Sequence, residues 1–365
     1  MAELELHELA PGGQTVDEMA ARVAAFLGEA RRSLDLALYD VRLPGSAGDL
    51  VADTLRDAAA RGVAVRIAYN ADHDERMFPP PPRTAPELIE ALPFPTAGIP
   101  GIPDLMHHKY VVRDGESVWT GSTNWTTDSW TIQENLVTIV DSAALAAAYT
   151  QNFEELWQAR DVSDTGRPEP ARLQVDGHPA RAWFTPGRGE DLSARIAAAI
   201  GRAQRRVRIA SPVITAGPVI GKLAEVAAEA RVDVGGVVDA TQMAQVFRQW
   251  GENPRSSWKI PIVESIFEHA EFSGKPSTPY TPESIHDFMH AKVTVADDVV
   301  FAGSFNLSRS GELNAENVLE LHDPELAERL AGFIDSIRAR YPRTAGAAGG
   351  AARPARFAAP PADRR

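Results

Sequence analysis

The sequence repeats one short arrangement of a histidine, a lysine and an aspartate. His107, Lys109 and Asp114 form the pattern His-x-Lys-x4-Asp in the first half of the chain. The second half repeats the pattern with three further residues, namely His290, Lys292 and Asp297. An imidazole can attack an electrophile or move a proton, and an ammonium group attracts anions. The two patterns therefore predict chemistry on a negatively charged substrate.

Each copy is followed by Gly-Ser-x-Asn and then by Glu-Asn. The second copy lacks one residue between Asp and Gly, and from Gly onward the spacing is the same in both halves. These segments add a serine, an asparagine and a glutamate to each motif, namely Ser122, Asn124, Glu134, Ser304, Asn306 and Glu316. Two such series in register are difficult to reach by chance. They indicate an internal duplication in which no motif position is missing from either copy.

Two facing copies of the motif suit a phosphodiester. The lysines and asparagines would hold its non-bridging oxygens and stabilise the charge that develops as phosphorus becomes five-coordinate. One histidine would attack phosphorus, and the other would protonate the departing alcohol and then activate water. Glu134 and Glu316 are available to orient the two imidazoles and raise their basicity. The scheme requires neither a metal ion nor another cofactor.

The elements that must position these residues also occur twice. In each half, an amphipathic helix precedes a strand of alternating apolar residues, a second helix–strand pair follows, and a helix comes last. The predicted helices include residues 22–27, 50–61, 143–157, 195–200, 219–230 and 324–340. Helices that alternate with short strands are typical of α/β layers. We therefore predict two similar α/β lobes, each a mixed sheet flanked by helices, related by a pseudo-two-fold axis.

The lobe boundaries follow from changes in composition. Asp, Gly and Pro collect at residues 160–179, so we expect the first lobe within residues 1–165 and the second within 180–342. Residues 343–365 consist mostly of Ala, Gly, Pro and Arg and are expected to form a disordered tail. Because both motifs lie on one chain, a monomer would be sufficient to form a complete site.

The doubled motif with its Gly-Ser-x-Asn segments resembles the phospholipase D superfamily. The similarity covers about residues 15–341 and is sharpest at 105–157 and 288–323. The first copy is particularly similar to the bacterial nuclease-like and cardiolipin-hydrolase-like branches of that family. The resemblance implies two α/β lobes that meet at a shared active site, a covalent histidine intermediate and no obligatory metal.

Carried over to this chain, the resemblance implies roles for individual residues of the catalytic motifs. His107 would be the nucleophile, and His290 would be the general acid and base. Lys109 and Lys292 would complete the two catalytic motifs. Asp114 and its second-half equivalent match the motif aspartates, whose implied role is mainly to support the hairpin that carries each motif.

The composition limits the remaining classes of protein. The chain has 365 residues, of which 44% are apolar and 24% charged, and this suits two globular domains of ordinary size. The absence of cysteine excludes disulfides, thiolate metal sites and a cysteine nucleophile. The N-terminus is acidic and no run of about 18 apolar residues occurs. We therefore expect neither a secretory signal nor a transmembrane span, and a cytoplasmic location.

The net charge of −13 favours a phospholipid or another small phosphodiester over a long nucleic acid. A nuclease acting on DNA or RNA remains an alternative, because the first motif looks nuclease-like. A basic strip for such a substrate would come from four arginines, namely Arg202, Arg205, Arg206 and Arg208. A homologue that binds phosphate or lipid without cleavage is a further alternative. Transfer to an alcohol, in place of hydrolysis, also remains open.

Several other residues near the motifs are interpreted as structural. His108 alternates to the face opposite His107. Packing in the core is expected for three tryptophans, namely Trp119, Trp125 and Trp130. His286 and His290 have the spacing of a helical zinc pair, but His290 belongs to the motif and no third ligand is evident.

Two long insertions precede the motifs. Residues 72–105 are rich in proline. Residues 239–288 are rich in aromatic side chains, which include Phe247, Trp250, Trp258, Phe267, Phe272 and Tyr280. Loops of this length are usually functional or mobile. We expect both insertions to roof the site, with the aromatic one as the main selector of substrate.

Overall fold

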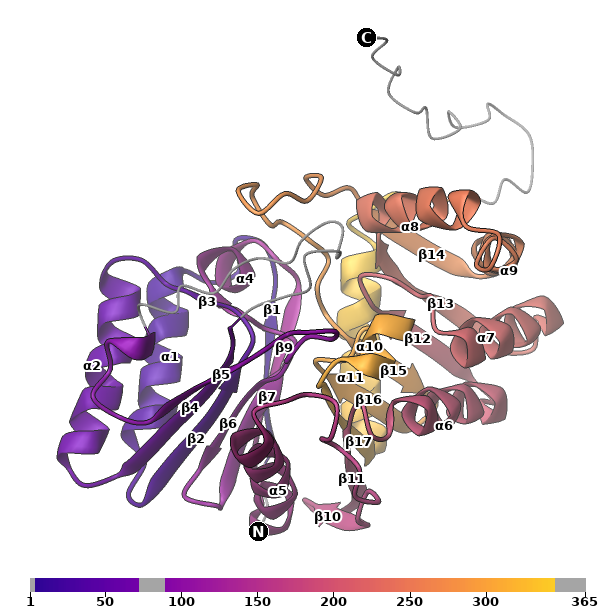
Figure 1. The fold of residues 1–365 in the computed structure, drawn as a ribbon. Coiled ribbons are helices and arrows are strands. Elements are labelled where there is room, and N and C mark those ends of the chain that lie inside the picture. The colour runs from indigo at the N-terminus through magenta and orange to yellow at the C-terminus, as the bar shows by residue number, and fades with distance from the viewer. Residues whose placement is uncertain (1–3, 72–88, 345–365) are drawn as a thin grey trace, which may run out of the picture.

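The computed structural model describes residues 4–71 and 89–344, which form two mixed β-sheets flanked by helices (Figure 1). The first sheet has the strand order β1-β9-β7-β6-β2-β4-β5. Its strands are β1 (Leu4–Leu9), β2 (Ser33–Leu38), β4 (Ala64–Asn70), β5 (Thr96–Ile99), β6 (Lys109–Arg113), β7 (Ser117–Gly121) and β9 (Asn135–Asp141). In this sheet, β2, β4 and β5 are parallel to one another, and the other neighbouring pairs are antiparallel.

The second sheet repeats this order as β11-β17-β16-β15-β12-β13-β14, and β10 is added beside β11. Its strands are β10 (Leu173–Val175), β11 (His178–Phe184), β12 (Arg206–Ala210), β13 (Asp233–Asp239), β14 (Glu271–Lys275), β15 (Val293–Ala296), β16 (Val299–Gly303) and β17 (Asn317–His322). The parallel and antiparallel pairs correspond as well. The shared topology confirms the predicted fold class of two similar α/β lobes.

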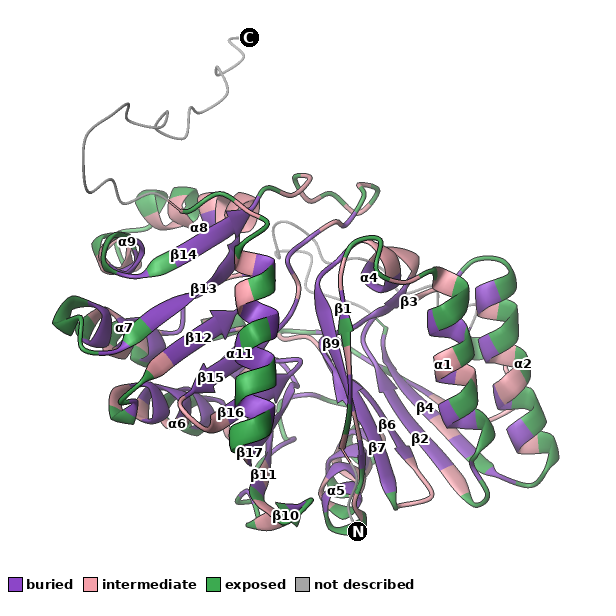
Figure 2. Cartoon of the chain, turned by 180° about the vertical axis from the view of Figure 1, so that it is seen from behind, coloured by how far each residue is buried: buried purple, intermediate pink, exposed green. Residues whose placement is uncertain are grey.

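Helices cover the outer face of each sheet and fill the space between the sheets (Figures 1 and 2). The outer helices are α1 (Val16–Gly28) and α2 (Ser46–Ala60) in the first lobe, and α6 (Gly189–Arg202), α7 (Gly217–Glu229) and α9 (Lys259–His269) in the second. The other helices are α4 (Thr127–Thr131), α5 (Ala143–Ala159), α8 (Ala240–Glu252), α10 (Arg309–Leu313) and α11 (Pro324–Arg338). A short two-stranded sheet pairs β3 (Val41–Arg42) with β8 (Trp125–Thr126). Within the described ranges, no helix is sufficiently long and apolar to cross a membrane.

Side-chain caps mark the start of the main helices. Thr15 and Glu18 form a reciprocal capping box at α1, as their spacing indicates. Ser142 caps α5, and Asp323 caps α11 ahead of a proline at the first helical position. Asp239 caps α8 directly after β13, so the chain turns from strand to helix at the edge of the second sheet.

Three clusters of buried apolar side chains hold these layers together. Two of them fill the space between each sheet and its outer helices. The third joins the lobes, because Tyr149 and Phe153 of α5 and Leu330 and Ile334 of α11 pack with apolar residues from both sheets. Burial of each such side chain stabilises the folded state by about 1.5–3 kcal/mol. The shared core fixes the two sheets, and hence the two motifs, relative to one another.

The structure adds one strand to the prediction and differs from two of the expected boundaries. The added strand is β1, which forms the edge of the first sheet. The second sheet begins at Leu173, ahead of the boundary expected at residue 180. Arg343 bridges to Ser273 of β14, although it was expected to open the disordered tail. The tail from residue 345 onward lies outside the described residues.

The aromatic segment 239–288 is not a loop over most of its length. It contains α8, α9 and β14, because its apolar side chains recur at helical and strand spacing and are drawn into the second lobe. Phe267 and Phe272 are buried in the core of that lobe. Of the proline-rich insertion, residues 72–88 lie outside the described part of the chain.

Candidate active site between the lobes

Each motif lies on a β-hairpin, and the motif aspartate occupies its turn. Asp114 and Asp297 join β6 to β7 and β15 to β16, with φ of 58° and 51°. The Asp114 carboxylate accepts backbone N–H groups of residues 31–33 at 2.6–3.1 Å, and Asp297 accepts those of residues 204–206 at 2.7–3.0 Å. Lys109 lies about 16 Å away at the other end of β6. The aspartates therefore support the hairpins. They were also predicted as catalytic residues, but they lie at the end of the hairpin away from the motif lysine.

His107 forms a hydrogen bond across the seam between the lobes. Its Nδ1 lies 2.7 Å from Oε1 of Glu316, and both side chains are almost fully buried. The ring packs edge-on against Tyr39, with 4.4 Å between the ring centroids. Because the carboxylate accepts from Nδ1–H, the lone pair of neutral His107 is on Nε2. That nitrogen is the one available for attack on a substrate.

Burial shifts the pKa values of this pair in opposite directions. Burial, together with the Lys109 and Lys292 ammonium groups, holds the pKa of His107 well below its usual range. Burial raises the pKa of Glu316 to about 7, although Lys109 opposes the change. His107 is therefore neutral near neutral pH in the free protein, in the form that a nucleophile requires.

His290 has a neutral partner in place of a carboxylate. Its Nδ1 lies 3.1 Å from Oδ1 of Asn135, which also accepts the Ser122 hydroxyl at 2.7 Å. The Asn135 amide nitrogen donates to Ser129 and Gln133 at 3.0–3.1 Å. These contacts fix the orientation of the amide, so Nδ1 of His290 must carry the hydrogen. As in the first motif, Nε2 is the nitrogen left for chemistry.

The Glu134 side chain does not bond to either motif histidine. Its carboxylate is fully buried and pairs with Lys275, with 2.8 Å between Oε2 and Nζ. The position beside His290 belongs to the following residue, Asn135. The prediction that Glu134 orients a histidine is therefore wrong, whereas Glu316 does lie against a histidine ring.

A shift of one residue between the two crossings of the seam accounts for this difference. Where the first motif meets the second lobe, Met106 forms a parallel bridge with Ala315. Where the second motif meets the first lobe, Met289 bridges to Glu134. The internal repeat would instead match Ala315 with Gln133. A one-residue shift turns each side chain of an extended segment to the opposite face, so Glu134 points away from the imidazole.

The motif lysines bond to the main chain of their own histidines. Lys109 Nζ donates to the carbonyl of His107 at 2.6 Å, and Lys292 Nζ donates to that of His290 at 2.7 Å. Burial lowers the pKa of Lys109 to about 7 and that of Lys292 well below its usual range. Burial and these two ammonium groups also hold the pKa of His290 well below its usual range. Each lysine therefore supports the main chain of its own motif, and burial disfavours its charged form in the free protein.

Both histidines open into a cavity of about 380 Å³ between the lobes. Asn124 and Asn306 lie in its wall, and the buried Oδ1 of each has no hydrogen-bond partner within the described residues. Rotation of either amide by half a turn presents its NH₂ group, so both can donate to a phosphate oxygen. Ser122 and Ser304 instead bond to the segments beneath the wall, at the asparagine that follows each motif glutamate. The serines therefore support the site and do not face its substrate.

The rest of the cavity wall is rich in amides. The amide side chains that line it are Asn124, Gln133, Gln242, Gln245, Gln249, Asn306 and Asn314. Among the described wall residues, Asp40 is the one carboxylate, and the Arg42 guanidinium pairs with it at 2.9 and 3.0 Å. An uncharged hydroxyl group would find both donors and acceptors here. An ammonium group would find no unpaired carboxylate in the described part of the wall.

Four of the neighbouring residues that the sequence marks as structural are buried in the core, and the fifth, His286, lines the cavity. His108 is fully buried with its Nδ1 3.3 Å from Asn317 Oδ1, and burial lowers its pKa to about 3. The tryptophans pack in the core beneath the outer helices of the first lobe, namely Trp119, Trp125 and Trp130. The His286 ring bonds to the Thr281 carbonyl at 3.0 Å. Across residues 4–71 and 89–344, no group of three or more His, Cys, Asp or Glu side chains is arranged to hold a metal ion.

The chain matches a family model described as the PLD-like domain of cardiolipin synthase, at residues 23–157 and 196–338. The two matched segments fall in the two lobes and together cover more than half of the chain. The chain belongs to the phospholipase D superfamily. The family assignment agrees with the doubled motif and with the resemblance drawn from it.

Individual relatives of this superfamily member are similar over part of their length. The mitochondrial cardiolipin hydrolase of Xenopus tropicalis is 31% identical over 149 residues, which cover 40% of this chain and 64% of that protein. The phospholipase D of Rickettsia bellii is 29% identical over 131 residues, which cover 36% of this chain and 60% of that protein. The chain therefore matches somewhat less than two thirds of the length of these relatives.

The fold is shared with solved structures of low sequence identity. The phosphatidylserine synthase of Haemophilus influenzae superposes with a TM-score of 0.66 at 14% identity, over 92% of this chain and 86% of that one. The polyphosphate kinase of Porphyromonas gingivalis gives a TM-score of 0.59 at 14% identity, over 93% of this chain and 47% of that one. These similarities show that the two-lobed architecture occurs in other proteins.

Some residues of the site are not predicted from the sequence. Asn135 carries a signal that could have identified it, because it follows Glu134 in the repeated Glu-Asn pair. The glutamines of α8 carry another, because Gln242, Gln245 and Gln249 recur on one helical face. Lys275 lies outside every repeated motif.

Proposed function

We propose that the protein is a phospholipase D-type phosphodiesterase that uses His107 as nucleophile and His290 as general acid and base. The observation that carries the proposal is the common cavity of the two imidazoles. Each ring is held from behind through Nδ1 and has Nε2 left for chemistry. An arrangement of two such imidazoles suits a double displacement at phosphorus.

In the first step, Nε2 of His107 attacks phosphorus and the bond from phosphorus to the leaving alcohol oxygen breaks. Protonated His290 gives its Nε2 proton to that oxygen, so the alcohol leaves as a neutral molecule. The Glu316 carboxylate stabilises the positive charge that develops on the attacking ring. The product of this step is a phosphohistidine and a neutral His290.

In the second step, neutral His290 accepts a proton from water as the water oxygen attacks phosphorus. The phosphorus–nitrogen bond breaks, its electron pair returns to Nε2 of His107, and His290 is again protonated. An alcohol in place of water would give transfer instead of hydrolysis. The chemistry of the two acceptors is the same, so the relative occupancy of the site by water and alcohol decides the outcome.

The charges around the site favour an anionic substrate. Lys109 and Lys292 lie buried behind the rings, and a phosphodiester between the lobes would lie close to both. Such an anion favours the protonated imidazole and so opposes the effect of burial on the pKa of His290. The amides of Asn124 and Asn306 can donate to the non-bridging oxygens as negative charge develops.

We infer a phospholipid substrate in preference to a nucleic acid. The basic strip that a nucleic acid would need is largely neutralised, because Arg205, Arg206 and Arg208 each pair with carboxylates. The similarity to a cardiolipin hydrolase and a phospholipase D points in the same direction. The amide-rich wall suits a head group that bears hydroxyls.

Turnover of bis(p-nitrophenyl) phosphate tests the mechanism. We expect His107→Ala and His290→Ala to lose activity by at least about 10²–10⁴-fold. A phosphohistidine hydrolyses in acid, so the intermediate should be captured by an alkaline quench and located on His107 by mass spectrometry. Equal activity in the three proteins would refute the mechanism. A parallel panel of cardiolipin, phosphatidylcholine, single-stranded DNA and RNA separates the phospholipase from the nuclease alternative.

A further inference from the structure

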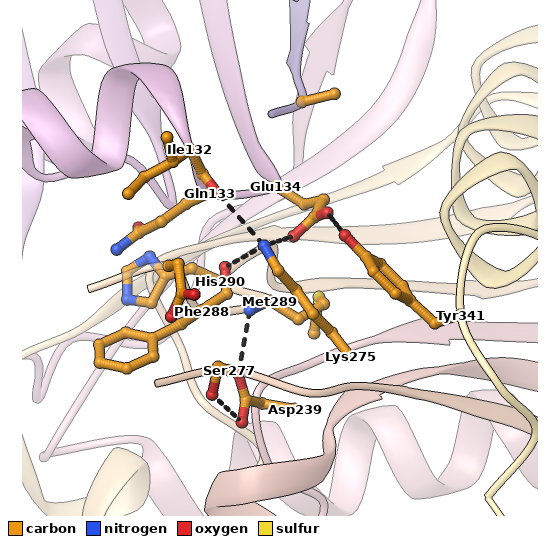
Figure 3. A network of polar contacts seen from close by, with 12 residues as sticks. Ile132, Gln133, Glu134, Asp239, Lys275, Ser277, Phe288, Met289, His290 and Tyr341 are labelled. Carbon is orange, nitrogen blue, oxygen red and sulfur yellow. Dashed lines mark hydrogen bonds and ion pairs between the residues drawn. The ribbon is translucent and has the colours of Figure 1, made fainter. Parts of the chain in front are cut away.

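A buried ion pair lies next to the residue that orients His290. The Glu134 carboxylate accepts from Lys275 Nζ at 2.8 Å through one oxygen and from the Tyr341 hydroxyl through the other (Figure 3). Lys275 Nζ also lies within hydrogen-bond distance of the carbonyls of Ile132 and Phe288, at 3.2 and 3.4 Å. Lys275 and Tyr341 belong to the second lobe, whereas Glu134 belongs to the first. The ion pair thus closes the seam on the side of the second motif.

The corresponding place beside the first motif is occupied by two apolar residues, Ile99 and Ala315. Lys275 ends β14 opposite Asp239 of β13, and Ile99 ends β5 opposite Asn70 of β4. Asn70 and Asp239 each accept the backbone N–H of the methionine ahead of the motif histidine, at 2.9 and 3.1 Å. This shared contact confirms that Ile99 and Lys275 are equivalent positions.

The partners of these two positions differ in the same way. Glu134 takes the place that Ala315 occupies in the first crossing, since each bridges to the methionine ahead of its motif histidine. An isoleucine and an alanine at one crossing are therefore replaced by a lysine and a glutamate at the other. Both members of the pair change together, which indicates a feature specific to the His290 side of the site.

The register at the seam decides which side chain His290 receives as a partner. The backbone carbonyl of Glu134 accepts the N–H of His290 at 3.1 Å, so the two residues are adjacent across the seam. At the other crossing Ala315 occupies this backbone position, and the next residue, Glu316, bonds to His107. At the second crossing the next residue is Asn135, which lies against Nδ1 of His290, while the Glu134 carboxylate pairs with Lys275 and Tyr341.

We propose that Lys275 neutralises the buried Glu134 carboxylate, so that no unbalanced negative charge lies beside Asn135 and His290. His290 then keeps a neutral partner, which does not stabilise its cation, and it is the better proton donor. His107 keeps a carboxylate partner and is the better nucleophile. This inference rests on the proposed function and adds the reason why two histidines from duplicated motifs take unequal roles.

The charges that face His290 make its pKa sensitive to loss of the Lys275 charge. Its own strand segment contributes Lys292, the first lobe contributes Lys109 and His107, and the preceding segment contributes His286. The Glu316 carboxylate is bonded to His107. Glu134 is the nearby carboxylate whose charge is balanced by a lysine, so loss of that lysine adds an uncompensated negative charge beside Asn135.

The test is an NMR titration of the full-length protein labelled in its histidine rings, with the His290 signals assigned from His290→Gln. In Lys275→Met we expect the pKa of His290 to rise by about one unit, because a nearby carboxylate favours the cation. In Lys275→Met/Glu134→Gln the rise should disappear, since no carboxylate remains. Lys222→Met is the matched control, because Lys222 pairs with Glu225 on the surface of α7.

The outcomes separate the possible explanations. A His290 pKa that is unchanged in Lys275→Met, or that rises equally in the double variant, would overturn the inference. If Lys275→Met does not fold, Glu134→Gln leaves the Lys275 ammonium group unbalanced. That variant must then lower the pKa of His290, and an unchanged value overturns the inference.

The titration does not depend on turnover, so the inference and the proposed function can fail separately. A shift in a protein that cleaves no phosphodiester contradicts the proposed function alone. Cleavage without a shift contradicts the role of Lys275 alone. In an active protein, alkaline-quench mapping adds a second result: we expect phosphate on His107 in the wild type and on both histidines in Lys275→Met.

Discussion

The Glu316 carboxylate of the second lobe hydrogen-bonds the His107 ring of the first lobe, with 2.7 Å between Oε1 and Nδ1. In the opposite direction, Asn135 of the first lobe holds His290 of the second at 3.1 Å. Each histidine therefore takes its orientation from the other lobe. The shared core around α5 and α11 keeps these partners in place, so it contributes to the chemistry as well as to stability.

Replacement of Glu316 by glutamine should slow formation of the phosphohistidine. Glutamine keeps an acceptor for Nδ1–H of His107 but removes the negative charge that stabilises the developing cation. We expect kcat to fall by about 10²–10⁴-fold with the fold retained. Rapid-quench measurement of p-nitrophenolate release checks this, with Glu264→Gln on the exposed side of α9 as the control. A burst of unchanged rate in Glu316→Gln would contradict the role given to the carboxylate.

The pH optimum for kcat/KM should lie below the optimum for kcat. The kcat/KM profile reports the free protein, in which burial and the motif lysines hold the pKa values of His107 and His290 low. A bound phosphodiester anion favours both imidazolium forms, so it raises both pKa values. The reactive form has neutral His107 and protonated His290, and both limbs of the profile therefore move to higher pH when substrate binds.

Rate profiles with bis(p-nitrophenyl) phosphate at constant ionic strength measure this displacement. Lys109, whose pKa burial lowers to about 7, adds to the loss of activity on the alkaline side as its charge disappears. An optimum for kcat at the same pH as that for kcat/KM, or at a lower pH, would mean that the substrate anion does not lie near the two rings.

Replacement of Asp114 or Asp297 by alanine should destabilise the fold while the chemistry of the folded protein is retained. Each carboxylate accepts three backbone N–H groups, and we expect losses of about 1–3 kcal/mol each in the free energy of unfolding. Asp114→Asn should cost less, because asparagine keeps an acceptor and tolerates the positive φ of the turn. Urea denaturation near neutral pH, together with kcat on the folded protein, measures both effects.

The stabilisation by these aspartates should disappear in acid. Burial alone would raise the pKa of Asp114 and Asp297, but the backbone donors outweigh it and lower both values. A carboxyl group whose pKa is lower in the folded state stabilises that state above its unfolded pKa of about 3.9. The contribution is lost as the pH falls through the folded value. A difference between wild type and Asp114→Ala that is as large near pH 2 as near pH 7 would contradict this account.

The doubled motif is sufficient to predict the two lobes and the central pair of histidines. Local spacing carries this information, because His-x-Lys places His107 and Lys109 on one face of an extended segment, and the sequence contains the pattern twice. The helices are predicted for the same reason, since their apolar residues recur at helical spacing. The aromatic segment 239–288 is misread as a loop because Gly251, Asn253 and Pro254 interrupt the apolar pattern between α8 and α9.

The partners of the two histidines could be predicted only in part. Glu134 and Glu316 occupy the same place in the repeated Glu-Asn pair, so the sequence treats them alike. Their different positions come from the one-residue shift where the chain crosses the seam, and that shift depends on contacts between the lobes. One feature of the sequence could have singled out Lys275. The chain has few lysines among its 37 basic residues, and two of them are the motif lysines. A lysine kept where arginine is the usual choice suggests a requirement for a compact ammonium group.

The choice of head group should depend on the amides of α8. Gln242 and Gln245 face the cavity one turn apart, and an amide can donate to one hydroxyl and accept from another. Leucine has a similar size and removes both abilities. For a phospholipid with a hydroxyl-bearing head group, we expect Gln245→Leu to raise KM by roughly 3–10-fold, which corresponds to one hydrogen bond of about 1 kcal/mol. The kcat should change little, because the amide does not act on the reacting atoms.

A comparison of phosphatidylglycerol with phosphatidylcholine in the same vesicles makes this prediction specific. The choline head group has no hydroxyl to lose, so its KM should be nearly the same in wild type and Gln245→Leu. Gln151→Leu, on the exposed face of α5, controls for an effect of the added leucine on vesicle binding. An equal rise in KM for both lipids would show that Gln245 supports the shape of the cavity and does not select the head group.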